Sequence, residues 1–117
     1  MYSLPKDYKK AWIDALRSGE YRQEYNHLQC EGGFCALGVA YYAVSNIPQD
    51  TLEYKTSLSR EFLENDCQGA YHVPEQLLNA TTLSDCIVRM NDEADERGLH
   101  HDFNFIANWI EDVVEDE

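Results

Sequence analysis

The residues of this chain best placed to do chemistry are two cysteines, Cys30 and Cys35, which flank a Gly-Gly pair. Cys35 stands directly before an apolar run that is typical of a buried helix. A thiol at a helix N-terminus has a lowered pKa, because the exposed amides and the helix dipole favour the thiolate. Cysteine hydrolases pair such a thiolate with a histidine base. Cys35 is therefore a candidate nucleophile, with His72 or His101 as the candidate base.

Three other interpretations of these cysteines compete with the nucleophile. Free cysteine is among the most buried residue types, which favours a structural role for Cys35 in the core. If Gly32-Gly33 form a hairpin turn, Cys30 faces Cys35 closely enough for a disulfide, although a reducing compartment opposes that bond. A zinc site would need a second pair of ligands, and Cys67 and Cys86 lie far apart in the sequence. We expect neither a metal nor a cofactor.

An acidic stretch that begins at Asn91 has the spacing of a calcium-binding loop. Four residues match the first, third, fifth and twelfth positions of an EF-hand loop: Asn91, Glu93, Asp95 and Asp102. Glu96 stands where that loop requires glycine, and Asp102 replaces its final glutamate. A solvated acidic loop is therefore favoured over a calcium site. We expect Asn91-Asp92 to cap or pin backbone at the end of their helix.

The chain is strongly acidic, with 22 acidic against 9 basic residues and a formal net charge of -13. Such a field repels nucleic acid and anionic membranes, so we expect neither as a partner. It would attract a basic protein, and its simplest alternative role is to keep the protein soluble. Negative charge at a helix C-terminus opposes the helix dipole, so the acidic C-terminal end suits recognition or solubility better than folding. Five acids there are the candidate partner-binding residues: Glu111, Asp112, Glu115, Asp116 and Glu117.

The apolar spacing predicts the elements that position these residues. Apolar residues three and four apart predict helices over residues 5–17, about 57–65, 82–90 and 103–113. Thr82 and Asp102 are the expected caps of the last two. The run over about 36–45 is apolar on every side and predicts a buried central helix, in which Gly38 indicates a close backbone contact. With a short β-hairpin at about 25–35, the expected fold class is mostly α, a compact helical fold around the central helix with at most one hairpin.

The length of 117 residues suits one domain with a substantial core. We expect a single globular domain over residues 1–117, with a short acidic C-terminal end at about 111–117. No apolar run approaches the roughly 20 residues of a membrane span. The N-terminus lacks the apolar segment of a signal peptide. A cytoplasmic location is therefore expected.

Four short motifs follow one another along the chain: ALRSGEYRQ (15–23), FCALGVAYYA (34–43), MND (90–92) and FNFIANWIE (103–111). In this order they resemble a family of small uncharacterised proteins found in bacteriophages and bacterial genomes. The resemblance implies a phage or mobile-element origin, and with it the cytoplasm of a host cell, but no mechanism. The chain departs from that family by inserting DEADERGLHH before Asp102.

These observations favour a non-enzymatic binding or regulatory protein of phage type, whose acidic surface engages a basic host protein. Binding is favoured over catalysis because no catalytic or cofactor signature surrounds the candidate residues. The alternative from another class is a small cysteine-dependent hydrolase that uses Cys35. A third alternative is a module that binds a small ligand in a pocket lined by Tyr41, Tyr42, Trp12 or Trp109.

Overall fold

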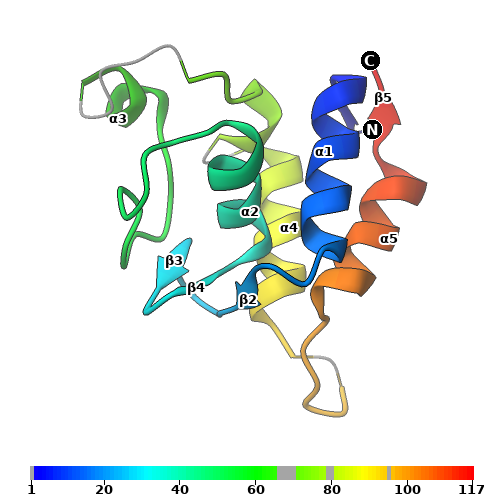
Figure 1. Ribbon diagram of the computed structural model, residues 1–117. Coiled ribbons are helices and arrows are strands. Elements are labelled where there is room, and N and C mark those ends of the chain that lie inside the picture. The colour runs from blue at the N-terminus through cyan, green and yellow to red at the C-terminus, as the bar shows by residue number, and fades with distance from the viewer. Residues whose placement is uncertain (1, 66–70, 79–80, 95) are drawn as a thin grey trace.

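The computed structural model describes residues 2–65, 71–78, 81–94 and 96–117, which form a mixed α/β fold (Figure 1). Its α-helices are α1 Lys6–Arg17, α2 Ala36–Val39, α3 Arg60–Asn65, α4 Thr82–Asp92 and α5 Phe103–Val113. A π-helical segment, Ala40–Val44, continues α2, and a 3-10 turn spans Glu75–Leu77. None of the helices in these residues is long and apolar enough to cross a membrane.

Two small sheets overturn the expected mostly α fold with at most one hairpin. Helices account for 48% of the structure and strands for 12%, which makes it an α/β mixture. One sheet pairs β1 with β5, and the other has the order β2-β4-β3. Two-residue strands are too short to carry an alternating apolar pattern, so the sequence indicated the hairpin but not the strands outside it. The strands are β1 Ser3–Leu4, β2 Arg22–Gln23, β3 Gln29–Cys30, β4 Gly33–Phe34 and β5 Glu115–Asp116.

The parallel pair β1–β5 joins the two ends of the described chain. Ser3 lies opposite Glu115, and Leu4 lies opposite Asp116. The Glu115 amide donates to the carbonyl of Tyr2 at 2.9 Å. Because β1 leads into α1 and β5 follows α5, this pairing fastens the first helix to the last, and the two termini lie at the same end of the molecule (Figure 1).

In the three-stranded sheet, β4 lies between β2, which is parallel to it, and β3, which is antiparallel. The β3–β4 hairpin was expected, but its turn residues are Glu31-Gly32 rather than Gly32-Gly33. Both turn residues have positive φ, 49° and 84°, as a type I′ turn requires. The turn therefore begins one residue earlier than expected and the pairing shifts by two residues, so Cys30 lies opposite Gly33 instead of Cys35.

The helices α1 and α5 pack side by side, and α1 makes its most extensive contact with α5 (Figure 1). The expected apolar stripes face each other there, with Trp12, Ile106 and Ile110 fully buried. The Asp102 side chain caps α5 as expected, because its carboxylate accepts the amide of Phe105 at 2.8 Å. These packed stripes confirm the helices predicted at residues 5–17 and 103–113.

The helix α2 and its π-helical continuation form the buried centre expected at about 36–45, and Val39 and Tyr41 are fully buried. A Cβ atom on Gly38 would lie 2.0 Å from the carbonyl oxygen of Leu28. The expected close backbone contact at Gly38 is therefore confirmed. Beside this centre, α4 begins as predicted, but its cap is Thr81 rather than Thr82.

Candidate functional site

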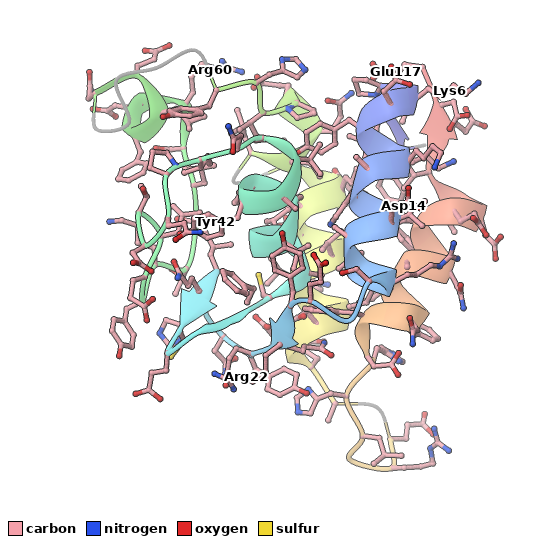
Figure 2. All side chains as sticks on the ribbon, viewed as in Figure 1. Lys6, Asp14, Arg22, Tyr42, Arg60 and Glu117 are labelled. Atoms are coloured by element: carbon pink, nitrogen blue, oxygen red, sulfur yellow. The ribbon has the colours of Figure 1, made fainter. Side chains whose placement is uncertain are left out.

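A pocket of about 330 Å³ lies between the three-stranded sheet and the π-helical segment. Its aromatic wall consists of Tyr21, Phe34 and Tyr42, the last labelled in Figure 2. The Phe34 ring contacts Tyr21 at a centroid distance of 5.5 Å and Tyr42 at 5.4 Å. The angles between these ring planes are 81° and 68°, so neighbouring rings stand nearly perpendicular. Three rings from different parts of the chain thus form adjoining walls of one pocket.

Two local features of the backbone place these rings. The parallel pairing of β2 with β4 brings Tyr21, which precedes β2, beside Phe34. In the π-helical segment the Ser45 amide bonds the carbonyl of Ala40 at 3.1 Å, five residues back. Such a π-helical turn changes the direction of the side chains along a helix and is often found at functional sites. Here the segment carries Tyr42 to the pocket.

The polar side of the pocket is formed by Gln29 and Asp50. Gln29 is 4% exposed, and its Nε2 atom donates to Asp50 Oδ1 at 3.0 Å. The hydroxyl of Tyr42 donates to Gln29 Oε1 at 2.5 Å and accepts the Leu52 amide at 2.7 Å. This chain of hydrogen bonds holds a carboxylate at the edge of an aromatic wall.

Two carboxylates next to this pocket, Glu31 and Glu53, raise the pKa of two neighbouring groups. Burial and the charges of Glu31, Glu24 and Glu53 raise the pKa of the Cys30 thiol. The charge of Glu31 also raises the pKa of Tyr54, which is 58% exposed. The Glu31 amide donates to Glu53 Oε1 at 2.7 Å, so these two acids lie together, and the turn that carries Glu31 also lines the pocket. We refer to Glu31 and Glu53 as the hairpin acids; Glu24 acts on Cys30 only and forms an ion pair with Arg22.

The fully buried Asn91 connects three of the sequence motifs. Its Oδ1 atom accepts hydrogen bonds from Gln23 Nε2 and from the amide of Ala36, both at 3.0 Å. Its Nδ2 atom donates to the Glu24 carbonyl at 2.8 Å. The adjacent Asp92 accepts a backbone amide of the loop before β3. The expectation that Asn91-Asp92 pins backbone is confirmed, and the motif residues meet there in a structural role.

The candidate nucleophile Cys35 is the buried N-cap residue of α2, and it is 3% exposed. Its Sγ atom accepts the Gly38 amide at 3.3 Å. Burial nevertheless raises the pKa of the Cys35 thiol to about 12, because desolvation outweighs this hydrogen bond. The thiol therefore stays protonated at neutral pH. Cys30 and Cys35 are both thiols, since the hairpin register does not place them opposite each other.

The structure does not bring either candidate base to Cys35. His72 is exposed, in the segment before the 3-10 turn. His101 stacks on Phe105 at a centroid distance of 4.0 Å, and its carbonyl accepts a hydrogen bond from Gln23. Within the described part of the chain, no hydrogen bond joins Cys35 to a histidine. The arrangement that a cysteine hydrolase would need is not assembled there.

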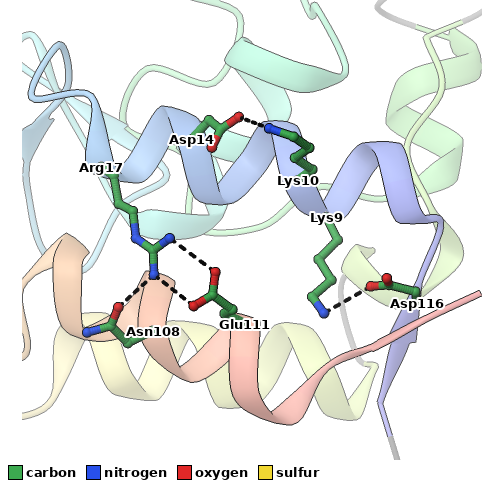
Figure 3. Close-up of polar contacts among 7 residues, drawn as sticks. All are labelled: Lys9, Lys10, Asp14, Arg17, Asn108, Glu111 and Asp116. Carbon is green, nitrogen blue, oxygen red and sulfur yellow. Dashed lines mark hydrogen bonds and ion pairs between the residues drawn. The ribbon is translucent and has the colours of Figure 1, made fainter.

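Three of the five candidate partner-binding acids at the C-terminus are bound to the rest of the fold. Arg17 contacts Glu111 at 3.2 Å, and Lys9 contacts Asp116 at 3.0 Å (Figure 3). Hydrogen bonding and charge from Arg17 lower the pKa of Glu111. The carboxylate of Glu117 accepts a hydrogen bond from the Ser3 hydroxyl in β1 at 3.2 Å. These acids help to hold α5 and β5 against α1 and β1, so they do contribute to the folded structure.

The other two C-terminal candidates, Asp112 and Glu115, are exposed. Neither carboxylate forms an ion pair or a hydrogen bond with the residues that the structure describes. They are the part of the predicted partner-binding set that is available to another molecule.

The metal sites considered from the sequence are not assembled among the described residues. Asn91 lies inside α4, and its side chain is fully engaged with backbone and Gln23. Asp95 of the calcium-type loop and Cys67 of the zinc set lie outside the described residues. Within those residues, no group of three or more His, Cys, Asp or Glu side chains could hold a metal ion.

Only one of the four aromatic residues expected to line a ligand pocket does so. Tyr42 lines the pocket, whereas Tyr41 and Trp12 are fully buried and Trp109 packs against Tyr2. The three rings of the pocket wall all lie within the first two sequence motifs. Their place in those motifs was the one feature of the sequence that could have indicated them. The lining residues that were not predicted include Tyr21, Gln29, Phe34 and Asp50.

One protein family matches nearly the whole chain. A family model described as "Domain of unknown function (DUF8296)" matches residues 4–114. This span runs from the end of β1 to the residue after α5 and includes the pocket and the Asn91 contacts. No curated protein and no solved structure matches the chain.

Proposed function

The chain belongs to the DUF8296 family, and we propose that it is a non-enzymatic binding protein of phage type that engages a basic protein in the cytoplasm of a bacterial host. The observation that carries this proposal is the pair of hairpin acids, Glu31 and Glu53, which lie together at 2.7 Å from the Glu31 amide to Glu53 Oε1. The charges of both acids raise the pKa of Cys30 and of Tyr54. A basic surface would be attracted to this part of the molecule.

The net charge of the whole chain also favours a basic partner. A formal net charge of -13 attracts cationic surfaces and accelerates their association. Five ion pairs join described residues, and each uses one basic residue from a chain that has only 9. The excess carboxylates therefore define the surface potential.

The described part of the chain supports binding rather than cysteine chemistry. Cys35 is buried with a raised pKa, and neither His72 nor His101 reaches it. An exposed tyrosine beside two carboxylates, in contrast, is a surface that suits a protein partner, because tyrosine is enriched among residues that contribute strongly to binding. Tyr54 occupies that place beside the hairpin acids.

The structure also changes which acids we assign to the partner. Glu111, Asp116 and Glu117 bind within the fold, whereas Asp112 and Glu115 stay available. We therefore place the main binding surface at the hairpin acids. The exposed C-terminal pair, Asp112 and Glu115, serves as the control in the test below.

The test uses two variants that each remove two negative charges, Glu31→Gln/Glu53→Gln and Asp112→Asn/Glu115→Gln. Glutamine at position 53 can still accept the amide of Glu31. Fluorescence anisotropy measures binding of a labelled peptide of alternating lysine and arginine. We expect wild-type binding to weaken steeply between ionic strengths of about 0.01 M and about 0.15 M, because the Debye length falls from about 30 Å to about 8 Å.

The two variants separate a binding surface from a general effect of charge. The hairpin variant should lose affinity and part of the salt dependence, while the C-terminal variant should bind like the wild type. Equal losses of affinity in both variants would mean that the peptide responds to the net charge alone. The hairpin acids would then not be a binding surface, and only the solubility role of the net charge would remain. Binding that does not depend on salt would exclude the electrostatic mechanism.

A further inference from the structure

We propose that the pocket walled by Tyr21, Phe34 and Tyr42 binds the guanidinium group of an arginine side chain presented by the partner. This inference rests on the proposed function, because it supplies the specific contact for a basic partner that the hairpin acids attract. The pocket and the hairpin acids are neighbours, since the turn that carries Glu31 also contributes Gly32 to the pocket.

The aromatic wall provides the first half of the recognition. A cation is attracted to the face of an aromatic ring within about 6 Å of its centroid, and sites for organic cations use several such rings. Here three rings meet at nearly perpendicular angles, 81° between Tyr21 and Phe34 and 68° between Phe34 and Tyr42. Rings arranged in this way surround a cation on more than one side. The described lining of the pocket contains no lysine or arginine that would compete.

The carboxylate of Asp50 provides the second half. Its Oδ1 atom accepts from the buried Gln29 amide at 3.0 Å, and Gln29 is held in turn by the hydroxyl of Tyr42. The Asp50 Oδ2 atom makes no hydrogen bond with the described residues, and a carboxylate has acceptor capacity for several bonds. A guanidinium group can donate two parallel hydrogen bonds to one carboxylate. The pocket therefore offers an anchored anion beside an aromatic wall.

These features favour arginine over lysine. The guanidinium group is planar, stacks on aromatic rings and is less strongly hydrated than an ammonium group, so it loses less on entering a partly apolar pocket. A volume of about 330 Å³ is near the lower limit of ligand pockets, which suits a single side chain better than an extended ligand.

The experiment is an NMR titration of the ¹⁵N-labelled protein with N-acetyl-arginine amide at an ionic strength of about 0.15 M, where long-range charge effects are screened. N-acetyl-citrulline amide is the neutral isostere, and N-acetyl-lysine amide carries the same charge without the planar group. We expect saturable shifts at residues 42–50 with the arginine probe. The citrulline and lysine probes should bind at least about tenfold more weakly, because they lose the charge or the paired hydrogen bonds.

Two variants locate the binding, with Asp112→Asn as the matched control for Asp50→Asn. Asparagine at position 50 keeps an acceptor for Gln29 and tolerates the positive φ of 65° found there. We expect Asp50→Asn to weaken the arginine probe about tenfold and Asp112→Asn to leave it unchanged. Phe34→Leu, checked for folding by circular dichroism, should weaken it as well. Equal binding of arginine and citrulline probes, or unchanged binding by Asp50→Asn, would overturn the proposal.

The two proposals fail separately in these experiments. If the Glu31→Gln/Glu53→Gln variant binds the basic peptide like the wild type while the arginine probe still binds at Asp50, the assignment of the hairpin acids is wrong and the pocket assignment stands. If the peptide depends on the hairpin acids but the arginine probe causes no shifts around the pocket, the pocket assignment alone is wrong.

Discussion

Replacing Asn91 by alanine tests whether the sequence motifs meet in a structural role. The Asn91 side chain is fully buried and bonds the Ala36 amide, the Glu24 carbonyl and the Gln23 side chain. Alanine removes all of these contacts and adds none. Gln23 keeps its bond to the carbonyl of His101, so it is not left without a partner. The two backbone groups have no such alternative in the structure.

The expected loss of stability follows from those two backbone groups. A buried polar group without a partner costs about 1–3 kcal/mol, so losing the partner of two such groups in Asn91→Ala should lower the free energy of unfolding by about 2–6 kcal/mol. Because small domains are stable by only about 5–15 kcal/mol, this loss is a large part of the total. Water that enters the site would move the result toward the lower end of that range.

Urea unfolding followed by tryptophan fluorescence and circular dichroism measures this loss by linear extrapolation. The control is Asn108→Ala, which makes the same chemical change at an exposed position where the side chain accepts a bond from Arg17 at 2.7 Å. We expect the control to change stability by less than about 0.5 kcal/mol. A loss below about 1 kcal/mol for Asn91→Ala, with an unchanged denaturant slope, would refute the reasoning.

Three further predictions concern other parts of the fold. Gly38→Ala should lower the free energy of unfolding by about 1–3 kcal/mol in the same urea assay, because the new Cβ atom would meet the Leu28 carbonyl; a stabilised variant would contradict this packing. Cys35 should react with iodoacetamide only after unfolding, because it is buried with a pKa of about 12; rapid labelling of the native protein near pH 7, measured by mass spectrometry, would reopen the hydrolase interpretation. Glu111→Gln should be less stable than the wild type at pH 7, and thermal melts should show this difference vanishing as the pH falls through the folded-state pKa, since Arg17 lowers the pKa of Glu111 in the folded protein. A difference that persists at low pH would mean that the ion pair is not its source.

The helices were predictable because each carries its own apolar pattern, whereas of the two sheets only the β3–β4 hairpin was predictable. Trp12 and Ile106 lie on stripes with helical spacing that the sequence displays directly. The pairing of Ser3 with Glu115, in contrast, depends on the packing of α1 against α5 and has no local signal. The hairpin turn was predicted one residue too late, because Glu31, although not a glycine, takes a left-handed conformation.

The candidate site was predictable only in part, for a related reason. Cys35 was correctly placed at a helix N-terminus, but the sequence does not show how far burial outweighs the helix dipole in setting a pKa. Tyr42 was named as a possible pocket residue without its neighbours. Tyr21 and Asp50 reach the same pocket through a parallel strand pair and through a loop after the π-helical segment, and neither has a periodic pattern.

The position of α1 beside α5 also has a consequence for synthesis on the ribosome. α1 ends at Arg17 and α5 begins at Phe103, so at about 5–20 residues per second its main packing partner is made roughly 4–17 s later. During that interval the apolar stripe with Trp12 has no α5 to cover it, and β1 has no β5 to pair with. The nascent chain therefore cannot complete this core until α5 and β5 have been made, and the apolar face of its first helix is exposed to other molecules until then.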